Sequence, residues 1–132
     1  MAARQTVRPK SFADQLNRLF DSIYPPGRDA YTSMELVEWA AGRGLRLSAP
    51  YLSQLRTGAR SRPSDSTVEL IASFFGIESE YFTDPESRYR EALDAELDWL
   101  ELAHNPDVRR LTSMLADLPA AARDQLMSAV GI

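Results

Sequence analysis

The chain has 132 residues, of which 44% are apolar, and this is enough for one ordinary domain or a small domain with an added module. It contains no cysteine, which excludes disulfides and cysteine-based zinc sites and fits a reducing compartment. No stretch approaches the roughly 20 apolar residues that span a bilayer, and the polar residues 1–6 do not resemble a signal peptide. We therefore expect a soluble, cytoplasmic protein without a membrane partner.

Charge is distributed unevenly along the chain. Residues 1–63 carry ten basic and five acidic side chains, net +5, whereas residues 64–132 carry five basic and fourteen acidic ones, net −9. Phosphates are attracted to a basic region and repelled by an acidic one, so the asymmetry favours nucleic-acid binding by the first half. The alternative is that both sets of charges are solvated and have no partner.

Capping residues and apolar periodicity predict five short helices between residues 11 and 83, after a basic arm, residues 1–10, that we expect to be disordered. Leu45 and Leu47 are expected to seat the loop before the third helix on the core. Five short helices in this length predict a compact all-helical (all-α) domain. The helices are expected to start near Ser11, Thr32 (a capping box with Glu35), Ser48, Ser64 and Ile77.

Nothing in the chain favours an enzyme. The one histidine, His104, lies at a predicted helix end, where a lone imidazole is usually a surface residue. The sequence contains no Gly-rich phosphate loop, no nucleophile with a base and no metal-ligand spacing, so we expect no catalytic residue, metal or cofactor. The acidic residues Asp94, Glu96, Asp98 and Glu101 have a helical spacing that places most of them on an outer, solvated face.

Residues 48–63 have the features of a recognition helix followed by a basic loop. Ser48 can cap the helix, and Leu52 and Leu55 can pin it to the domain. Polar side chains such as Gln54 would lie on the other face, where they could reach base edges. Arg60 and the residues after it could grip backbone phosphates.

Spaced residues of this segment resemble the phage-repressor-like (XRE) helix-turn-helix domain, over roughly residues 11–83. They are Ser48, Ser53-Gln54-Leu55, Gly58 and Pro63-Ser64, followed by a helix that ends at Phe75-Gly76-Ile77. Longer runs, over nearly the whole chain, are similar to the EspR family of nucleoid-associated regulators. These runs are Phe12-Ala13, Leu16-Asn17-Arg18-Leu19-Phe20-Asp21, Tyr24-Pro25-Pro26-Gly27-Arg28, residues 48–56 and Tyr81-Phe82-Thr83-Asp84.

The resemblance implies a DNA-binding domain over residues 11–83, a helical dimerisation domain over residues 84–132, and binding of double-stranded DNA at many genomic sites with bridging or looping. Carried over by position, it places base contacts at Ala49, Pro50, Ser53 and Gln54. It places phosphate contacts at Ser48, Tyr51, Arg56, Thr57, Arg60, Ser61 and Arg62.

Two features depart from the repressor pattern. The chain between Leu36 and Ser48 is about a turn longer, and Ala49 and Pro50 replace polar readers. The latter two can touch a thymine methyl group but offer no side-chain hydrogen bond. We therefore expect modest base selectivity, with Gln54 as the main direct reader through an adenine-type contact, and an affinity that is mainly electrostatic. The alternative for Gln54 is an ordinary exposed helix residue.

Residues 84–132 are expected to form three helices, starting at Asp84-Pro85, Asn105-Pro106 and Leu118-Pro119. Three helices make a marginal core, and one helix-turn-helix grips a half-site weakly, so we expect them to build a homodimer. The alternative is that the stripe of apolar residues in the first of them packs inside one chain. The expected dimer contacts are Tyr89, Leu93, Leu97, Leu100, Leu111, Leu115 and Leu126.

The sequence therefore predicts a homodimeric, nucleoid-associated transcriptional regulator. One alternative is a protein-interaction module, such as an antitoxin or an adaptor, which would co-purify with one protein partner and lack affinity for DNA. Another is a ligand-sensing repressor, but the C-terminal region is too small to enclose a pocket of roughly 300 Å³ comfortably. We therefore expect no small-molecule ligand.

Overall fold

A computed structural model describes residues 11–129 and 131, so the predicted basic arm, residues 1–10, lies outside the described residues. All eight elements of regular structure in this part are α-helices, which confirms the all-α class. The chain divides into two compact units, one ending at Leu100 and the other beginning at Glu101. The helices are α1 (Phe12–Ser22), α2 (Ser33–Gly42), α3 (Ala49–Thr57), α4 (Asp65–Phe75), α5 (Glu80–Thr83), α6 (Arg88–His104), α7 (Pro106–Ala116) and α8 (Ala120–Ala129).

Side-chain caps begin most of these helices where the sequence predicts them. Ser11 Oγ accepts a hydrogen bond from the backbone N–H of Asp14 at 3.0 Å. Thr32 and Glu35 form the predicted capping box at the start of α2. Each cap satisfies backbone donors that the first turn leaves unpaired. Ser48, Ser64 and Asn105 cap α3, α4 and α7 in the same way.

The start of α6 differs from the prediction. The sequence places it at Asp84-Pro85, whereas the helix begins at Arg88. Asp84 Oδ1 instead accepts from the N–H of Glu86 at 3.0 Å and forms a local turn. Ser87 supplies the cap, because its Oγ accepts from the N–H of Tyr89 at 3.0 Å.

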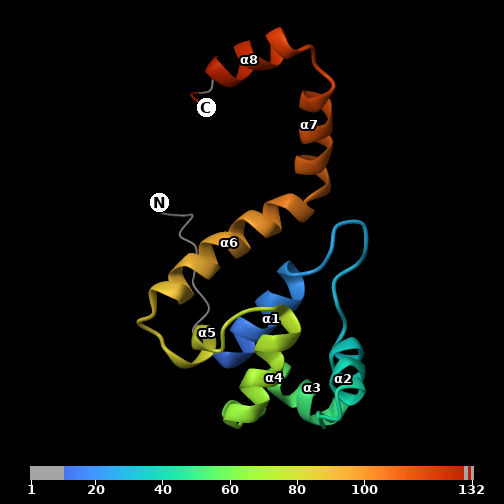
Figure 1. The fold of residues 1–132 in the computed structure, drawn as a ribbon, viewed down its shortest axis with the longest axis vertical. Coiled ribbons are helices and arrows are strands. Elements are labelled where there is room, and N and C mark those ends of the chain that lie inside the picture. Colours follow the sequence, from blue (N-terminus) through green and yellow to red (C-terminus); the bar gives the residue numbers. More distant parts are fainter. Residues whose placement is uncertain (1–10, 130, 132) are drawn as a thin grey trace. The chain divides into compact units, whose positions relative to one another are not determined.

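The core of the first unit is formed where α1 packs on α3, and α2 packs on α3 and α4 (Figure 1). Phe20 of α1 meets Phe75 of α4 edge to face, with ring centroids 5.1 Å apart. Leu52 and Leu55 of α3 are fully buried in the same cluster, so α3 is held firmly from behind.

The first part of α6 also belongs to this core. Leu93 and Leu97 are buried in it, next to the fully buried Tyr81. Asp94 is only 4% exposed, and its Oδ1 accepts from the Tyr81 hydroxyl at 2.9 Å and lies 3.3 Å from Nη1 of Arg18. Asp94 is therefore an exception to the prediction that most of the acidic residues of α6 lie on a solvated face, because it belongs to the inner face of the helix.

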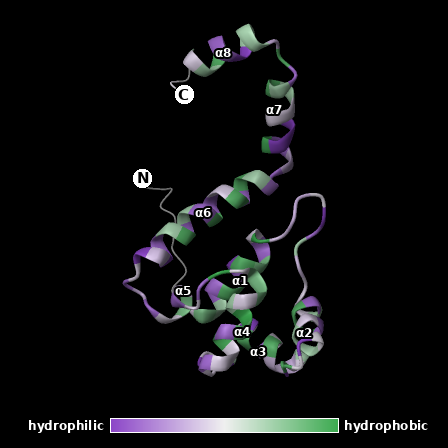
Figure 2. Ribbon diagram, viewed as in Figure 1, coloured by the Kyte–Doolittle hydropathy of each residue, from purple (hydrophilic) through white to green (hydrophobic). Residues whose placement is uncertain are grey.

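In the second unit, no residue among 101–129 is buried. Apolar and polar residues are interleaved along α7 and α8, as Figure 2 shows. On α7, Leu111 and Met114 leave 58% and 60% of their surfaces exposed. Within residues 101–129, both helices therefore expose apolar side chains that the described part of their own unit does not bury.

Candidate nucleic-acid interface

The helix predicted to meet DNA, α3, is defined at both ends by its sequence. Ser48 Oγ accepts from the N–H of Tyr51 at 3.2 Å, and Pro50 lies in the first turn, where its missing N–H costs no intrahelical bond. Gly58 ends the helix with a φ of +87°, a left-handed conformation that favours glycine. The chain can therefore reverse sharply into the basic loop, residues 59–63.

The two faces of α3 are separated as predicted. Leu52 and Leu55 point into the core, and Tyr51 is half-buried. Every residue predicted to contact bases lies on the exposed side, and five of the seven predicted phosphate contacts are exposed next to them. The exposed residues are Ser48, Ala49, Pro50, Ser53, Gln54, Thr57, Arg60, Ser61 and Arg62.

The turn before α3 carries two exposed basic side chains that are not among the DNA contacts predicted from the sequence. Gly44 has a φ of +74° and lets the chain turn after α2. Leu47 is buried, as predicted, but the prediction that Leu45 also packs on the core is wrong, because its side chain is 47% exposed. Arg43 and Arg46 flank Leu45 and are both exposed. Their charge and their place in the longer turn are the signals that could have identified them.

The Arg56 side chain forms its contacts within the protein, with residues of α1 and α2. Its Nε donates to Asn17 Oδ1 at 2.7 Å, and Asn17 Nδ2 donates back to the Arg56 carbonyl oxygen at 2.8 Å. Its Nη1 donates to Ser33 Oγ at 2.9 Å, and the guanidinium lies 4.0 Å from the ring centroid of Phe20. Burial lowers the pKa of Arg56, although the charge of Asp21 opposes this. The side chain assigned by sequence to phosphate thus joins α3 to α1 and α2.

We expect Arg56→Ala to lower the free energy of unfolding by about 1–3 kcal/mol, because it removes two side-chain hydrogen bonds and the contact with Phe20. Urea denaturation followed by circular dichroism measures this change. Arg62→Ala is the matched control, since an exposed arginine is expected to contribute less than about 0.5 kcal/mol. Equal stability of the two variants would contradict the structural role of Arg56.

The basic loop folds back on the exposed face of α3. The backbone N–H of Arg60 donates to the carbonyl oxygen of Gln54 at 3.1 Å. The side chains follow the same path, since Arg60 Nε donates to Gln54 Oε1 at 3.0 Å. A predicted base reader and a predicted phosphate contact are therefore paired with each other.

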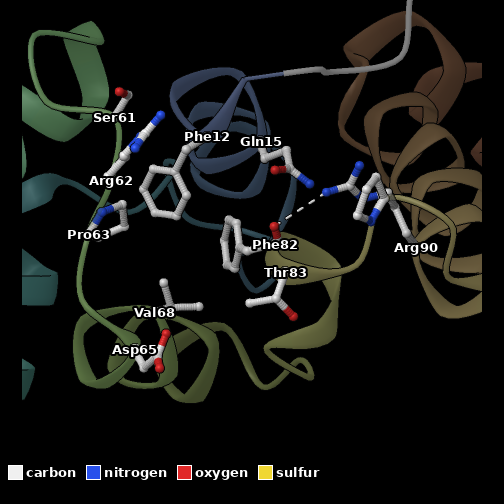
Figure 3. Close-up of a pocket in the computed structure, with 11 residues that line it drawn as sticks. Phe12, Gln15, Ser61, Arg62, Pro63, Asp65, Val68, Phe82, Thr83 and Arg90 are labelled. Carbon is white, nitrogen blue, oxygen red and sulfur yellow. Dashed lines mark hydrogen bonds between the residues drawn. The ribbon is translucent and has the colours of Figure 1, made fainter.

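The rest of the loop lies along a groove of about 460 Å³ in the first unit. Figure 3 shows Ser61, Arg62 and Pro63 on one side of it, facing Phe12 and Phe82, whose ring centroids are 4.8 Å apart. The loop therefore forms one wall of this groove, and the start of α1 and the end of α5 contribute to the opposite wall. Arg62 remains exposed above this support.

The residues predicted to form a dimer fall into two groups. Four of them pack in or against the core of the first unit, which agrees with the alternative that the stripe packs inside one chain: Tyr89, Leu93, Leu97 and Leu100. Tyr89 also accepts, at its hydroxyl, a hydrogen bond from the N–H of Glu78 at 2.9 Å. The other three belong to the second unit, where Leu111 and Leu126 are exposed and Leu115 is half-buried.

The part of the chain that the structure describes contains neither a metal-binding cluster nor a membrane-spanning helix. No group of three or more acidic, histidine or cysteine side chains comes together there in a way that could hold a metal ion. Among its helices, none has the length and apolar character needed to cross a membrane.

Fold and surface together define a class: an all-helical protein that exposes a capped helix with a basic loop on one unit and helices with exposed apolar side chains on the other. Two curated proteins, both named nucleoid-associated protein EspR and both from Mycobacterium tuberculosis (strains CDC 1551 / Oshkosh and ATCC 25618 / H37Rv), are each 46% identical to the chain over 120 residues. The match covers 91% of this chain and 89% of each relative. The chain therefore belongs to the EspR family of nucleoid-associated proteins. No family model matches it.

Proposed function

We propose that the chain is a homodimeric, nucleoid-associated regulator that binds double-stranded DNA in the cytoplasm. The observation that carries the proposal is the exposed face of α3 with its basic loop, in a chain that belongs to a family of nucleoid-associated proteins. In this proposal α2 and α3 act as a helix-turn-helix, and α3 enters the major groove. The exposed side chains of Ala49, Pro50, Ser53 and Gln54 then face base edges, and those of Ser48 and Thr57 face phosphates.

In this proposal the arginines that surround α3 bind the phosphates of the DNA backbone. Arg43 and Arg46 precede the helix, and Arg62 follows it, all of them exposed. Arginine matches phosphate with two parallel hydrogen bonds, so these positions can hold the helix in register on the duplex. Because Ala49 and Pro50 offer no side-chain hydrogen bond, much of the affinity comes from phosphates rather than from bases.

This proposal predicts a strong dependence of DNA affinity on salt. Each phosphate contact contributes about 0.9 to the slope of log affinity against log salt concentration on duplex DNA. We expect Arg62→Ala to reduce the slope by about one contact and to weaken binding to all duplexes by a similar factor. Fluorescence anisotropy over a salt series with two unrelated duplexes measures both effects.

The control is Arg109→Ala, which removes the same charge from an exposed position on α7 and is expected to leave the slope unchanged. Failure of the wild-type chain to bind any duplex at low salt would contradict the proposed function. Co-purification with a single protein partner in that case would favour an interaction module instead.

Self-association rests on the second unit. Its helices bury no residue among those described up to 129, and a unit of this size gains little stability without a covered core. A second copy of the chain supplies such a cover, because both copies carry the same apolar side chains. The two DNA-binding units of one dimer can then hold two DNA segments, which would account for bridging or looping. The large exposed apolar residues of the unit are Leu102, Leu111, Met114, Leu118, Leu126 and Met127.

A further inference from the structure

The pairing of Gln54 with Arg60 determines which base edge α3 can read. From it we infer that Arg60 is a specificity-determining residue and that the pair recognises guanine rather than adenine. The inference rests on the proposed function, because it concerns how a bound duplex is read.

Two hydrogen bonds place the pair. The N–H of Arg60 donates to the carbonyl oxygen of Gln54 at 3.1 Å, which brings the loop back to α3, and Arg60 Nε donates to Gln54 Oε1 at 3.0 Å. The left-handed Gly58, with a φ of +87°, makes this reversal possible. Both side chains are exposed, so they form part of the surface that meets the DNA.

Chemistry fixes which end of the Gln54 amide faces Arg60. A guanidinium carries five N–H donors and no acceptor, so only the amide oxygen can meet it. Gln54 Oε1 thereby accepts from a cation, and the other end of the amide is the Nε2 donor. Arg60 keeps further N–H donors on Nη1 and Nη2, so the pair offers mainly donors.

The bases differ in what they offer to such a surface. Guanine presents two acceptors in the major groove, N7 and O6, whereas adenine presents one acceptor, N7, and a donor amino group at N6. An adenine contact by glutamine needs Oε1 to accept from N6, but here that oxygen faces Arg60 and the guanidinium opposes another donor. Guanine satisfies the donors of both residues. This replaces the adenine-type contact that Gln54 alone would suggest.

The test uses the full chain and a tight duplex selected from randomised DNA. Each guanine of the bound site is replaced in turn by 7-deazaguanine, which keeps base pairing but lacks the N7 acceptor. We expect one substitution to weaken wild-type binding about tenfold, the low end of what a bidentate base contact contributes, because N7 is one of the two acceptors that the pair uses. In both Gln54→Ala and Arg60→Ala, the same substitution is expected to have almost no effect, because the pair that reads it is gone.

Arg62→Ala is the matched control, since it removes an exposed arginine from the same loop. It is expected to weaken every duplex by a similar factor and to keep the tenfold effect of 7-deazaguanine. If Arg60→Ala behaves in this way too, Arg60 contacts only phosphate and the inference is overturned. The inference is also overturned if the substitution whose effect disappears in Gln54→Ala is 7-deazaadenine for adenine and not 7-deazaguanine for guanine. Absence of any DNA binding by the wild type would instead contradict the proposed function.

Discussion

Asp94→Ala is expected to lower the free energy of unfolding by about 3 kcal/mol, because it breaks a buried ion pair by removing one partner. Asp94 is 4% exposed and lies between the guanidinium of Arg18 and the hydroxyl of Tyr81. Loss of the carboxylate leaves a cation in a low-dielectric site and a buried hydroxyl without its acceptor. Urea denaturation at a fixed protomer concentration measures the change, since stability of a dimer depends on concentration.

The neighbours of Asp94 limit the size of the loss. Arg18 is also paired with Asp98, which keeps part of the compensation in place after Asp94 is removed. Burial first, and then the charge of Asp94, raise the pKa of Tyr81, so this hydroxyl stays protonated and continues to need an acceptor. Asp94→Asn keeps an oxygen for Tyr81 and is expected to cost less than half as much as alanine.

Two control variants separate burial from charge. Glu96→Ala removes a carboxylate from an exposed position of α6, and its effect is expected to stay within about 0.5 kcal/mol. Asp98→Ala removes the more exposed partner of Arg18, so we expect a loss of at most about 1 kcal/mol. A loss below about 1 kcal/mol in Asp94→Ala would contradict the view that this network fixes α6 to the first unit.

The position of α6 shows which features of the fold can be predicted from the sequence and which cannot. Its helical character, and the caps of α1 to α4 and of α7, follow from local signals, because a serine, threonine or asparagine before an apolar rhythm favours a helix start. The exposed face of α3 follows from the same periodicity. The periodicity does not show what packs against the apolar stripe of a helix. Leu93 and Leu97 would suit a partner chain as well as the core, and only the packed fold distinguishes the two.

The polar network has the same limitation. Asp94 lies one position after Leu93 and three before Leu97, so its place on the inner face was available from the spacing. Its partner Arg18 is on α1, 76 residues away, and no local pattern links the two. Likewise, Arg56 ends α3 as an apparently exposed cation, and only the approach of Asn17 and Ser33 gives it an internal role. Long-range pairs of this kind depend on tertiary packing rather than on local sequence.

The proposed self-association through the second unit predicts the other large effect. Replacing both Leu111 and Met114 by aspartate is expected to make the chain monomeric and to weaken its binding to a duplex with two sites about a hundredfold, because linked DNA-binding units profit from a high effective concentration. Both residues are more than half exposed within one chain, so the change does not disturb the core of the first unit. Sedimentation equilibrium measures the mass, and fluorescence anisotropy measures the affinity.

The matched control for this double variant is Ser113→Asp combined with Thr112→Asp, which adds the same charge to exposed positions on the opposite, polar side of α7. It is expected to keep the mass and the affinity of the wild type. Binding of the Leu111/Met114 variant to a duplex with a single site is expected to change much less, because one DNA-binding unit is enough there. This difference separates a lost partner from a damaged DNA-binding surface. A wild-type chain that is monomeric, or a double variant that remains dimeric, would show that the apolar face of α7 does not hold two copies together.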